Sequence, residues 1–67
     1  MIFENYSRVR LLSRLYRNKG VDVGAIGYII GVYDNGAKYE IEFSGLGGIS
    51  IAQLVLGGEE IELCELG

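Results

Sequence analysis

Hydrophobic and charged residues alternate strictly over residues 38–43. Tyr39, Ile41 and Phe43 fall on one side of an extended chain, and the lysine and glutamates between them fall on the other. Strict alternation is typical of a β-strand with one buried and one solvent-exposed face, whereas helical geometry would scatter these apolar residues around the axis. The pattern therefore predicts a strand over 38–43 with three bulky residues on its inner face.

An Asn-Gly pair lies just before this strand and follows another stretch rich in branched and aromatic residues. Asn35 and Gly36 both accept the positive φ angles that tight hairpin turns require. Residues 26–33 and 37–43 are therefore predicted to form an antiparallel hairpin. Gly31 leaves the first of these strands without a side chain to pack, which indicates a bulge or a sharp bend.

The N-terminal stretch fits two patterns. As a strand over residues 6–12, it directs Val9 and Leu11 toward the core. Apolar residues also recur at helical spacing over residues 6–17, so a short helix is the alternative. We favour the strand, and the sequence leaves the helix open. Two short strands are predicted near the other end of the chain, over residues 49–54 and 61–65.

A long irregular loop is predicted over residues 13–24. Gly24 and Gly27 are interpreted as part of a tight turn that starts a bent strand. A phosphate-binding loop would instead lead into the N-terminus of a helix. Five short strands with one long loop after the first predict a single all-β domain over residues 1–67, a small SH3-like five-stranded antiparallel barrel.

The composition agrees with one small domain and adds an expectation of self-association. A chain of 67 residues holds a single core, yet 49% of its residues are hydrophobic. Exposed apolar surface usually marks an interface, so we expect a homo-oligomer or a partner protein to cover part of it. No apolar run is long enough to span a membrane, and a lone cysteine forms no internal disulfide. The cytoplasm is therefore the expected location.

Charge is distributed unevenly along this chain, whose net charge is −3. Five of the six basic residues fall in the first third, namely Arg8, Arg10, Arg14, Arg17 and Lys19. Four of the nine acidic residues fall in the last nine positions, namely Glu59, Glu60, Glu62 and Glu65. Pairing of the first and last strands would neutralise these charges across the sheet, and we favour this interpretation. The alternative is a charged patch that binds a partner of opposite charge.

The order of these segments resembles a known family. The resemblance rests on residues 8–12, 24–30, 32–33, 35–36, 39–43 and 54–56, followed by a final acidic strand. Over about residues 6–65, the chain is similar to small uncharacterised bacterial proteins that are catalogued as a domain of unknown function. The resemblance implies an SH3-like or KOW-type barrel. Because members of such families tend to be encoded near toxins, it also implies an immunity or antitoxin-like role.

The sequence offers no catalytic constellation. It contains no histidine, which is the commonest general base and metal ligand. Cys64 has no histidine or lysine beside it in the sequence and is predicted to be a buried structural thiol. The acidic group Glu59, Glu60, Glu62 and Glu65 lacks the alternating ligands and the glycine hinge of a calcium loop. We therefore predict no enzymatic activity, no cofactor and no metal site.

The long first loop carries the strongest binding signal. Its residues 14–17 include tyrosine and arginine, which are enriched at the centres of protein interfaces. The alternative is that Leu15 and Tyr16 fold over one end of the barrel as a lid while the arginines are solvated. With Lys19, the same cations and aromatic ring could also bind nucleic acid. A sequence pI near 4.7 disfavours that function, since most affinity for nucleic acid comes from phosphate neutralisation.

A protein-binding module is thus the predicted function, with Arg14, Leu15, Tyr16, Arg17 and Lys19 as its first candidate surface. Nucleic-acid binding and an assembly role in a larger complex are the alternatives. Glu59, Glu60 and Glu62 are predicted to steer a basic protein partner. Leu46 and Ile49, in a glycine-rich connection, form a second apolar candidate surface.

Overall fold

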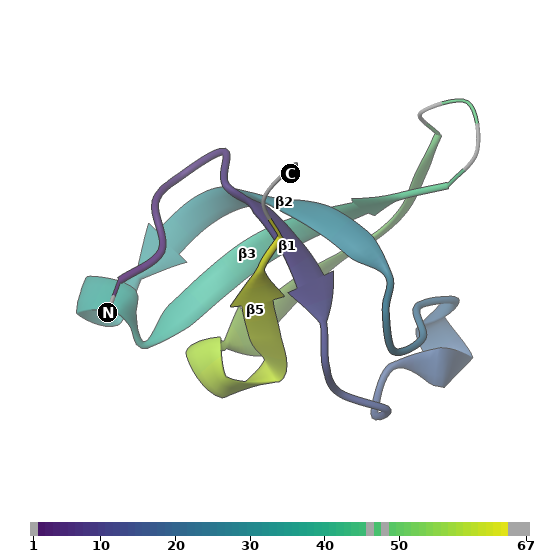
Figure 1. Ribbon diagram of the computed structural model, residues 1–67, viewed down its shortest axis with the longest axis horizontal. Helices are drawn as coiled ribbons and strands as arrows, with labels where there is room; N and C mark the ends of the chain where they lie inside the picture. Colours follow the sequence, from purple (N-terminus) through teal and green to yellow (C-terminus); the bar gives the residue numbers. More distant parts are fainter. Residues whose placement is uncertain (1, 46, 48, 65–67) are drawn as a thin grey trace.

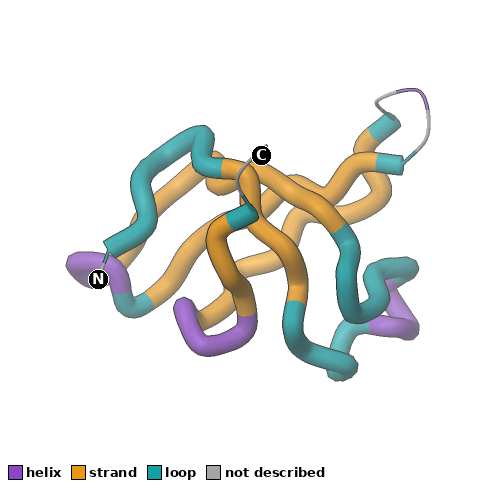
Figure 2. The backbone as a smooth tube through the Cα atoms, in the orientation of Figure 1, coloured by secondary structure: helices purple, strands orange, loops and turns teal. Residues whose placement is uncertain are grey.

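The fold is a single antiparallel sheet of five strands in the order β4-β3-β2-β1-β5. The structure is a computed structural model, and it describes residues 2–45, 47 and 49–64. The strands are β1 (Arg8–Leu11), β2 (Ile26–Tyr33), β3 (Lys38–Ser44), β4 (Ser50–Gly57) and β5 (Ile61–Leu63). Short 3-10 helices lie in the connections, namely η1 (Arg17–Lys19), η2 (Asp34–Gly36) and η4 (Gly58–Glu60) (Figures 1 and 2).

The central hairpin of β2 and β3 confirms the prediction made from the Asn-Gly pair. The turn begins one residue before that pair, because Asp34 also adopts a left-handed conformation, with φ angles of 51°, 55° and 95° at Asp34, Asn35 and Gly36. The bulge predicted in β2 is also confirmed. Ile29 pairs with Ile41 and Gly31 pairs with Glu40, so one residue of β2 has no partner between them.

The alternation of β3 places its bulky residues in the core, as predicted. Tyr39, Ile41 and Phe43 are almost completely buried. The remaining buried hydrophobic residues come from the other strands and from the first loop, and they are Val9, Leu11, Val21, Ile29, Leu54, Leu56 and Ile61. The core therefore lies on one face of the curled sheet, and the charged residues of β3 lie on the other.

The N-terminal stretch forms a strand, as predicted, and the helical alternative is wrong, but β1 covers only Arg8–Leu11 of the predicted residues 6–12. β1 pairs with β2 through Arg8 opposite Tyr28 and with β5 through Leu11 opposite Ile61. Val9 and Leu11 are fully buried between these neighbours. A strand with partners on both sides satisfies its backbone groups across the sheet, so helical hydrogen bonds are not needed here.

The downstream strands differ in length from the prediction. β4 extends to Gly57 because Leu54 and Leu56 continue its buried face opposite β3. β5 begins at Ile61, which is buried, but Leu63 near its end is exposed to solvent. The predicted end of this strand at residue 65 lies outside the described residues.

The predicted barrel closure is not confirmed, although the all-β antiparallel architecture is. In the described part of the chain β4 pairs only with β3 and β5 only with β1, so these two strands are the edges of an open sheet. The 3-10 turn η4 joins them directly, and Figure 1 shows the sheet curling between its two edges. β5 has three residues, which limits how many ladder bonds it can contribute.

The segment before β1 covers one end of the core, and the sequence patterns had placed only its last residues, Tyr6 and Ser7, and these in the first strand. The Phe3 ring packs edge-on against Tyr39, with 5.4 Å between ring centroids, and the Phe3 backbone N–H donates to the Tyr39 hydroxyl at 3.1 Å. Tyr6 follows in a left-handed conformation with a φ of 69°, and its N–H donates to the Ile29 carbonyl at 2.7 Å. The segment is thus fixed at two points before β1 begins.

Candidate functional site

The first loop, residues 12–25 between β1 and β2, is held at its base by the continuation of strand pairing. The Leu11 N–H donates to the Ala25 carbonyl at 2.9 Å, and the Gly24 N–H donates to the Leu11 carbonyl at 2.8 Å. Gly24 has a φ of 91°, as the predicted turn requires, because side chains rarely tolerate this conformation. Gly27 was predicted to belong to the same turn, and this is wrong: strand pairing already begins at Ile26, and Gly27 lies within β2 opposite Val9 and Phe43. The loop therefore leaves the sheet and returns to it at fixed positions.

Tyr16 anchors the middle of the first loop to the rest of the domain. Its ring packs partly buried against the core, and its hydroxyl donates to a Glu60 carboxylate oxygen at 2.8 Å. The other Glu60 oxygen accepts the Gly57 backbone N–H at 3.1 Å, so the carboxylate links the loop to η4. Val21, further along the loop, is buried in the core. Of the two predicted roles for Tyr16, this geometry agrees with the lid.

The same contacts change the ionisation of the Tyr16 phenol. Partial burial of the ring disfavours the phenolate most. The hydrogen bond to Glu60 and the negative charges of Glu60 and Glu59 act in the same direction. Together they raise the pKa of Tyr16 to about 12.

Tyr16→Phe is expected to lower the free energy of unfolding at neutral pH by roughly 1–2 kcal/mol, because one hydrogen bond to a carboxylate is lost. The Tyr16 pKa is higher in the folded protein than its usual 10.0, so its contribution is fully present below pH 10 and is lost as the pH rises toward about 12. Urea unfolding followed by circular dichroism from pH 7 to 11.5 measures this. The two stability curves should converge above pH 10, and parallel curves over the whole range would contradict the assignment.

The three predicted basic residues of the loop have different environments. The Arg17 guanidinium lies 2.9 Å from an Asp22 carboxylate oxygen, and this hydrogen bond, with one from the Val23 N–H, lowers the pKa of Asp22. Arg14 and Lys19 are exposed, and the described residues offer neither of them a salt-bridge partner within 4 Å. The cationic character of the loop surface thus comes chiefly from these two side chains.

Apolar side chains also reach solvent from this loop. Leu15 is 76% exposed, so it does not take part in the predicted lid, and its N–H donates to the Ser13 hydroxyl at 3.2 Å. Leu12 and Val23, near the two ends of the loop, are also exposed. The loop therefore combines an anchored interior with an apolar and cationic exterior.

The acidic residues predicted to steer a partner are largely engaged within the domain. Glu62 on β5 forms a 2.9 Å salt bridge with Arg10 on the adjacent β1, which confirms the predicted charge pairing of the first and last strands. Glu60 is the acceptor for Tyr16, as described above. Glu59 is exposed on η4. The structure thus brings Tyr16 and Glu60 together, two candidates that the sequence assigned to separate surfaces.

Comparison with protein families gives one match. The profile described as a domain of unknown function (DUF4926) matches residues 5–63, which include all five strands and the first loop. The chain belongs to the DUF4926 family. A search of curated proteins and a search of solved structures each returned no match. The family description confirms the expected resemblance to an uncharacterised domain and assigns no activity to it.

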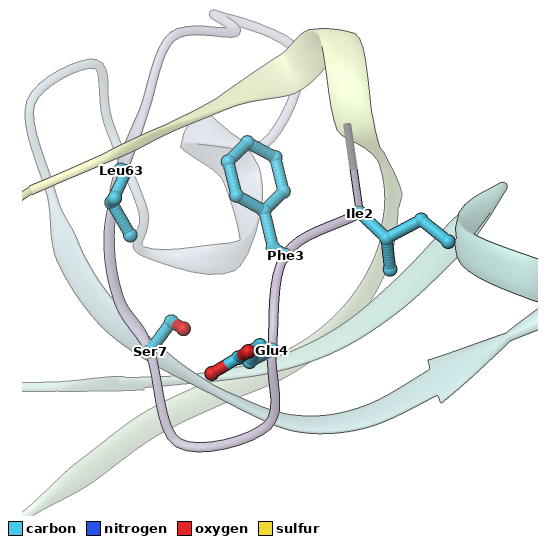
Figure 3. A pocket seen from close by; sticks show the side chains of 5 residues that line it. All are labelled: Ile2, Phe3, Glu4, Ser7 and Leu63. Atoms are coloured by element: carbon cyan, nitrogen blue, oxygen red, sulfur yellow. The ribbon is translucent and has the colours of Figure 1, made fainter.

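A small pocket lies on another side of the DUF4926 domain, between the N-terminal segment and β5 (Figure 3). Its volume is about 200 Å³, and its lining residues are Ile2, Phe3, Glu4, Ser7 and Leu63. Small-molecule sites usually measure about 300–1,000 Å³ and enclose most of the ligand. The Phe3 ring stands between Ile2 and Leu63 in this view, and the pocket is smaller than that range.

Other candidates in this DUF4926 domain are placed as follows. Cys64 is half-buried rather than fully buried, and its thiol sulfur lies 3.5 Å from an Arg10 guanidinium nitrogen. Ile49 of the second apolar candidate is 71% exposed, and its companion Leu46 lies outside the described residues. The described residues contain no cluster of three or more metal-binding side chains. They also contain no helix that is long and apolar enough to cross a membrane.

Proposed function

We propose that this DUF4926 domain is a non-enzymatic protein-binding module and that its first loop is the binding surface. One observation carries the proposal. Leu15, at 76% exposure, stands beside the exposed Arg14 on a loop whose neighbouring residue Tyr16 is fixed to the core. An exposed apolar side chain flanked by a cation fits the apolar centre and polar rim of a protein interface.

The anchoring of the loop supports this role energetically. Binding by a flexible loop costs conformational entropy for every residue that becomes ordered. Here, Tyr16 and Val21 pack against the core, and the Gly20 N–H donates to the Arg17 carbonyl at 3.0 Å. These contacts order the loop before any partner arrives. Less of the free energy that Leu15 gains on contact with a partner is then offset by the cost of ordering the loop, so the affinity is higher.

The surface also suggests the chemistry of the partner. Arg14 and Lys19 are exposed cations, whereas Glu60 and Glu62 are already paired inside the domain. We therefore propose a protein partner with an apolar pocket for Leu15 and acidic groups around it. Steering of a basic partner, as expected from the sequence, would depend mainly on Glu59.

Nucleic-acid binding is the second candidate, and one observation weighs against it. Stacking on bases needs an exposed aromatic face near the cations. The Tyr16 ring is partly buried and its hydroxyl is bonded to Glu60, so it is not presented to a base in this conformation.

An immunity or antitoxin-like role in the bacterial cytoplasm is the specific role we propose within the protein-binding class, and an assembly subunit is the alternative. The resemblance to families encoded near toxins supports it. We also propose that the domain is a variant of the SH3-like barrel. The five-stranded antiparallel meander, the long first loop and the 3-10 turn before β5 support this relationship.

Affinity capture of the tagged protein from a lysate of its native cells, with and without nuclease, tests the proposed class. We expect a stoichiometric protein partner that survives nuclease treatment. A known or predicted toxin among the captured proteins would support the specific role, and a metabolic enzyme would support the assembly role. Enrichment of nucleic acid, with all captured protein lost on nuclease treatment, would overturn the proposal in favour of the second candidate.

A further inference from the structure

The edge strand β4 lacks most of the features that usually protect a sheet edge. It spans Ser50–Gly57, eight residues without a charge and without proline. In the described part of the chain, the backbone of residues 50–56 forms hydrogen bonds with β3 and none on its other side. Natural edge strands are usually short, charged, bulged or interrupted by proline, because unpaired N–H and C=O groups recruit further strands.

The regular part of β4 is long enough to act as a template. A bulge lies at Ile51, near the start of the strand, and Ala52–Gly57 then keep an unbroken register with β3. Val55, in the middle of this segment, is β-branched and 57% exposed on the face that also carries Glu40. β4 is the last strand on one side of the sheet, and in Figure 1 the tip of the β3–β4 hairpin reaches away from β1 and β5.

The opposite edge of the sheet shows the contrast. β5 has only three residues, Ile61–Leu63, and its central residue is charged. Glu62 is held there by the salt bridge to Arg10. A short edge with a charge at its centre is a poor template for another strand. Of the two edges, β4 is therefore the one that is suited to pairing.

We propose that β4 pairs antiparallel with β4 of a second copy, so that two sheets join across a twofold axis into one. The strand is self-complementary. The two copies can pair in any antiparallel register in which the buried face of one sheet continues the buried face of the other. In each such register, the inward residues Ala52, Leu54 and Leu56 of one copy lie opposite inward residues of the other copy, and the outward Gln53 and Val55 lie opposite outward residues. No charge meets a like charge, and the Gln53 amide can both donate and accept. A twofold contact of this kind closes at the dimer.

This dimer does not depend on the proposed protein partner. It uses the edge of β4, whereas partner binding uses Leu15 on the first loop, so either proposal can fail alone. The paired edge is smaller than a standard protein interface, and we expect a dissociation constant of about 1–100 µM.

Sedimentation equilibrium of the purified full chain over a range of concentrations tests the proposal. The wild type should follow a monomer–dimer equilibrium, and Val55→Lys should weaken the dimer about tenfold or more, because a lysine would enter the paired edge of each copy. Tyr28→Lys is the matched control. Tyr28 is also exposed and lies opposite Glu42 of β3, as Val55 lies opposite Glu40, but it belongs to a central strand.

Three results would overturn the proposal. They are a monomer at all concentrations up to about 1 mM, a ring or filament larger than a dimer, and equal weakening by the control. Hydrogen exchange of the unmodified protein gives a second test that does not depend on the folding of any variant. Amides of residues 52–56 on the outer edge of β4 should gain protection as the concentration rises, and protection that is independent of concentration would contradict the dimer.

Discussion

Gly27→Ala is expected to destabilise the domain by roughly 3 kcal/mol, because the space for a side chain at this position is already filled. A Cβ atom would lie 2.8 Å from the Glu42 carbonyl oxygen, 2.8 Å from the Ile41 Cγ2 and 2.9 Å from the Phe43 Cδ1. One of these atoms belongs to the backbone of β3, and Gly27 itself pairs with Phe43 in the centre of the sheet. Relief therefore requires the two central strands to move apart, which would disturb the core packing.

Gly31→Ala is the matched control in the same strand. A Cβ there would approach only the end of the Tyr33 ring, at 3.1 Å from its hydroxyl, and this side chain is exposed, so that moving it costs at most its solvent-exposed hydrogen bond to Glu40. We expect a change within about 0.5 kcal/mol. Urea unfolding monitored by circular dichroism compares the two variants. Because a domain of this size is stable by only about 3–10 kcal/mol, the difference should be plain. Equal stabilities for the two variants would contradict the close-packing argument.

Local patterns in the sequence predicted the central elements of the fold. The alternation around Ile41 fixed which face of β3 is buried, and the Asn35-Gly36 pair located the hairpin. Gly31 marked the bulge because a strand interior without a side chain is seldom regular. These features depend on residues close together in the chain, so a short window of sequence contains the information.

Local sequence patterns could not predict contacts between residues that are far apart in the chain. Tyr16 and Glu60 are 44 residues apart, and nothing in either segment indicates the other. The packing of Phe3 on Tyr39 joins positions 36 residues apart and fills an end of the core that no strand covers. Barrel closure was predicted from the number of strands, but it depends on whether β4 and β5 meet, and their pairing partners are β3 and β1.

The candidate site was predicted in composition but not in arrangement. Residues 14–17 are predicted to bind a partner because they combine arginine, leucine and tyrosine. This composition does not indicate which of the side chains is buried. In the structure the aromatic residue is the anchor, and Leu15 is the exposed apolar group. An amphipathic loop needs one apolar residue inward to be ordered, and the larger ring of Tyr16 removes more apolar surface from water in that position.

Leu15→Asp is expected to weaken binding of the captured protein partner about 30-fold to 100-fold, a loss of roughly 2–3 kcal/mol. The variant removes the apolar contact and places a carboxylate in the pocket that received it. It should leave the fold intact, since Leu15 is largely exposed and lies outside the core. Arg14→Ala should weaken binding less than Leu15→Asp does, because a charge at the rim of an interface affects the association rate more than the affinity.

Ile49→Asp provides a close control for this variant. Leucine and isoleucine are isomers, and Leu15 and Ile49 have exposures of 76% and 71%. The two substitutions therefore alter composition, charge and exposed apolar area almost equally in two different connections of the chain. Ile49 also belongs to the second apolar surface considered from the sequence, so the pair of variants decides between the two candidates.

The most direct test is the dissociation constant of the captured partner, measured by titration calorimetry with the wild type, Leu15→Asp and Ile49→Asp. If the first loop is the binding surface, Leu15→Asp raises the constant at least about 30-fold, while Ile49→Asp changes it less than about threefold. Unchanged affinity for Leu15→Asp, or a larger loss for Ile49→Asp, would show that the first loop is not the binding surface.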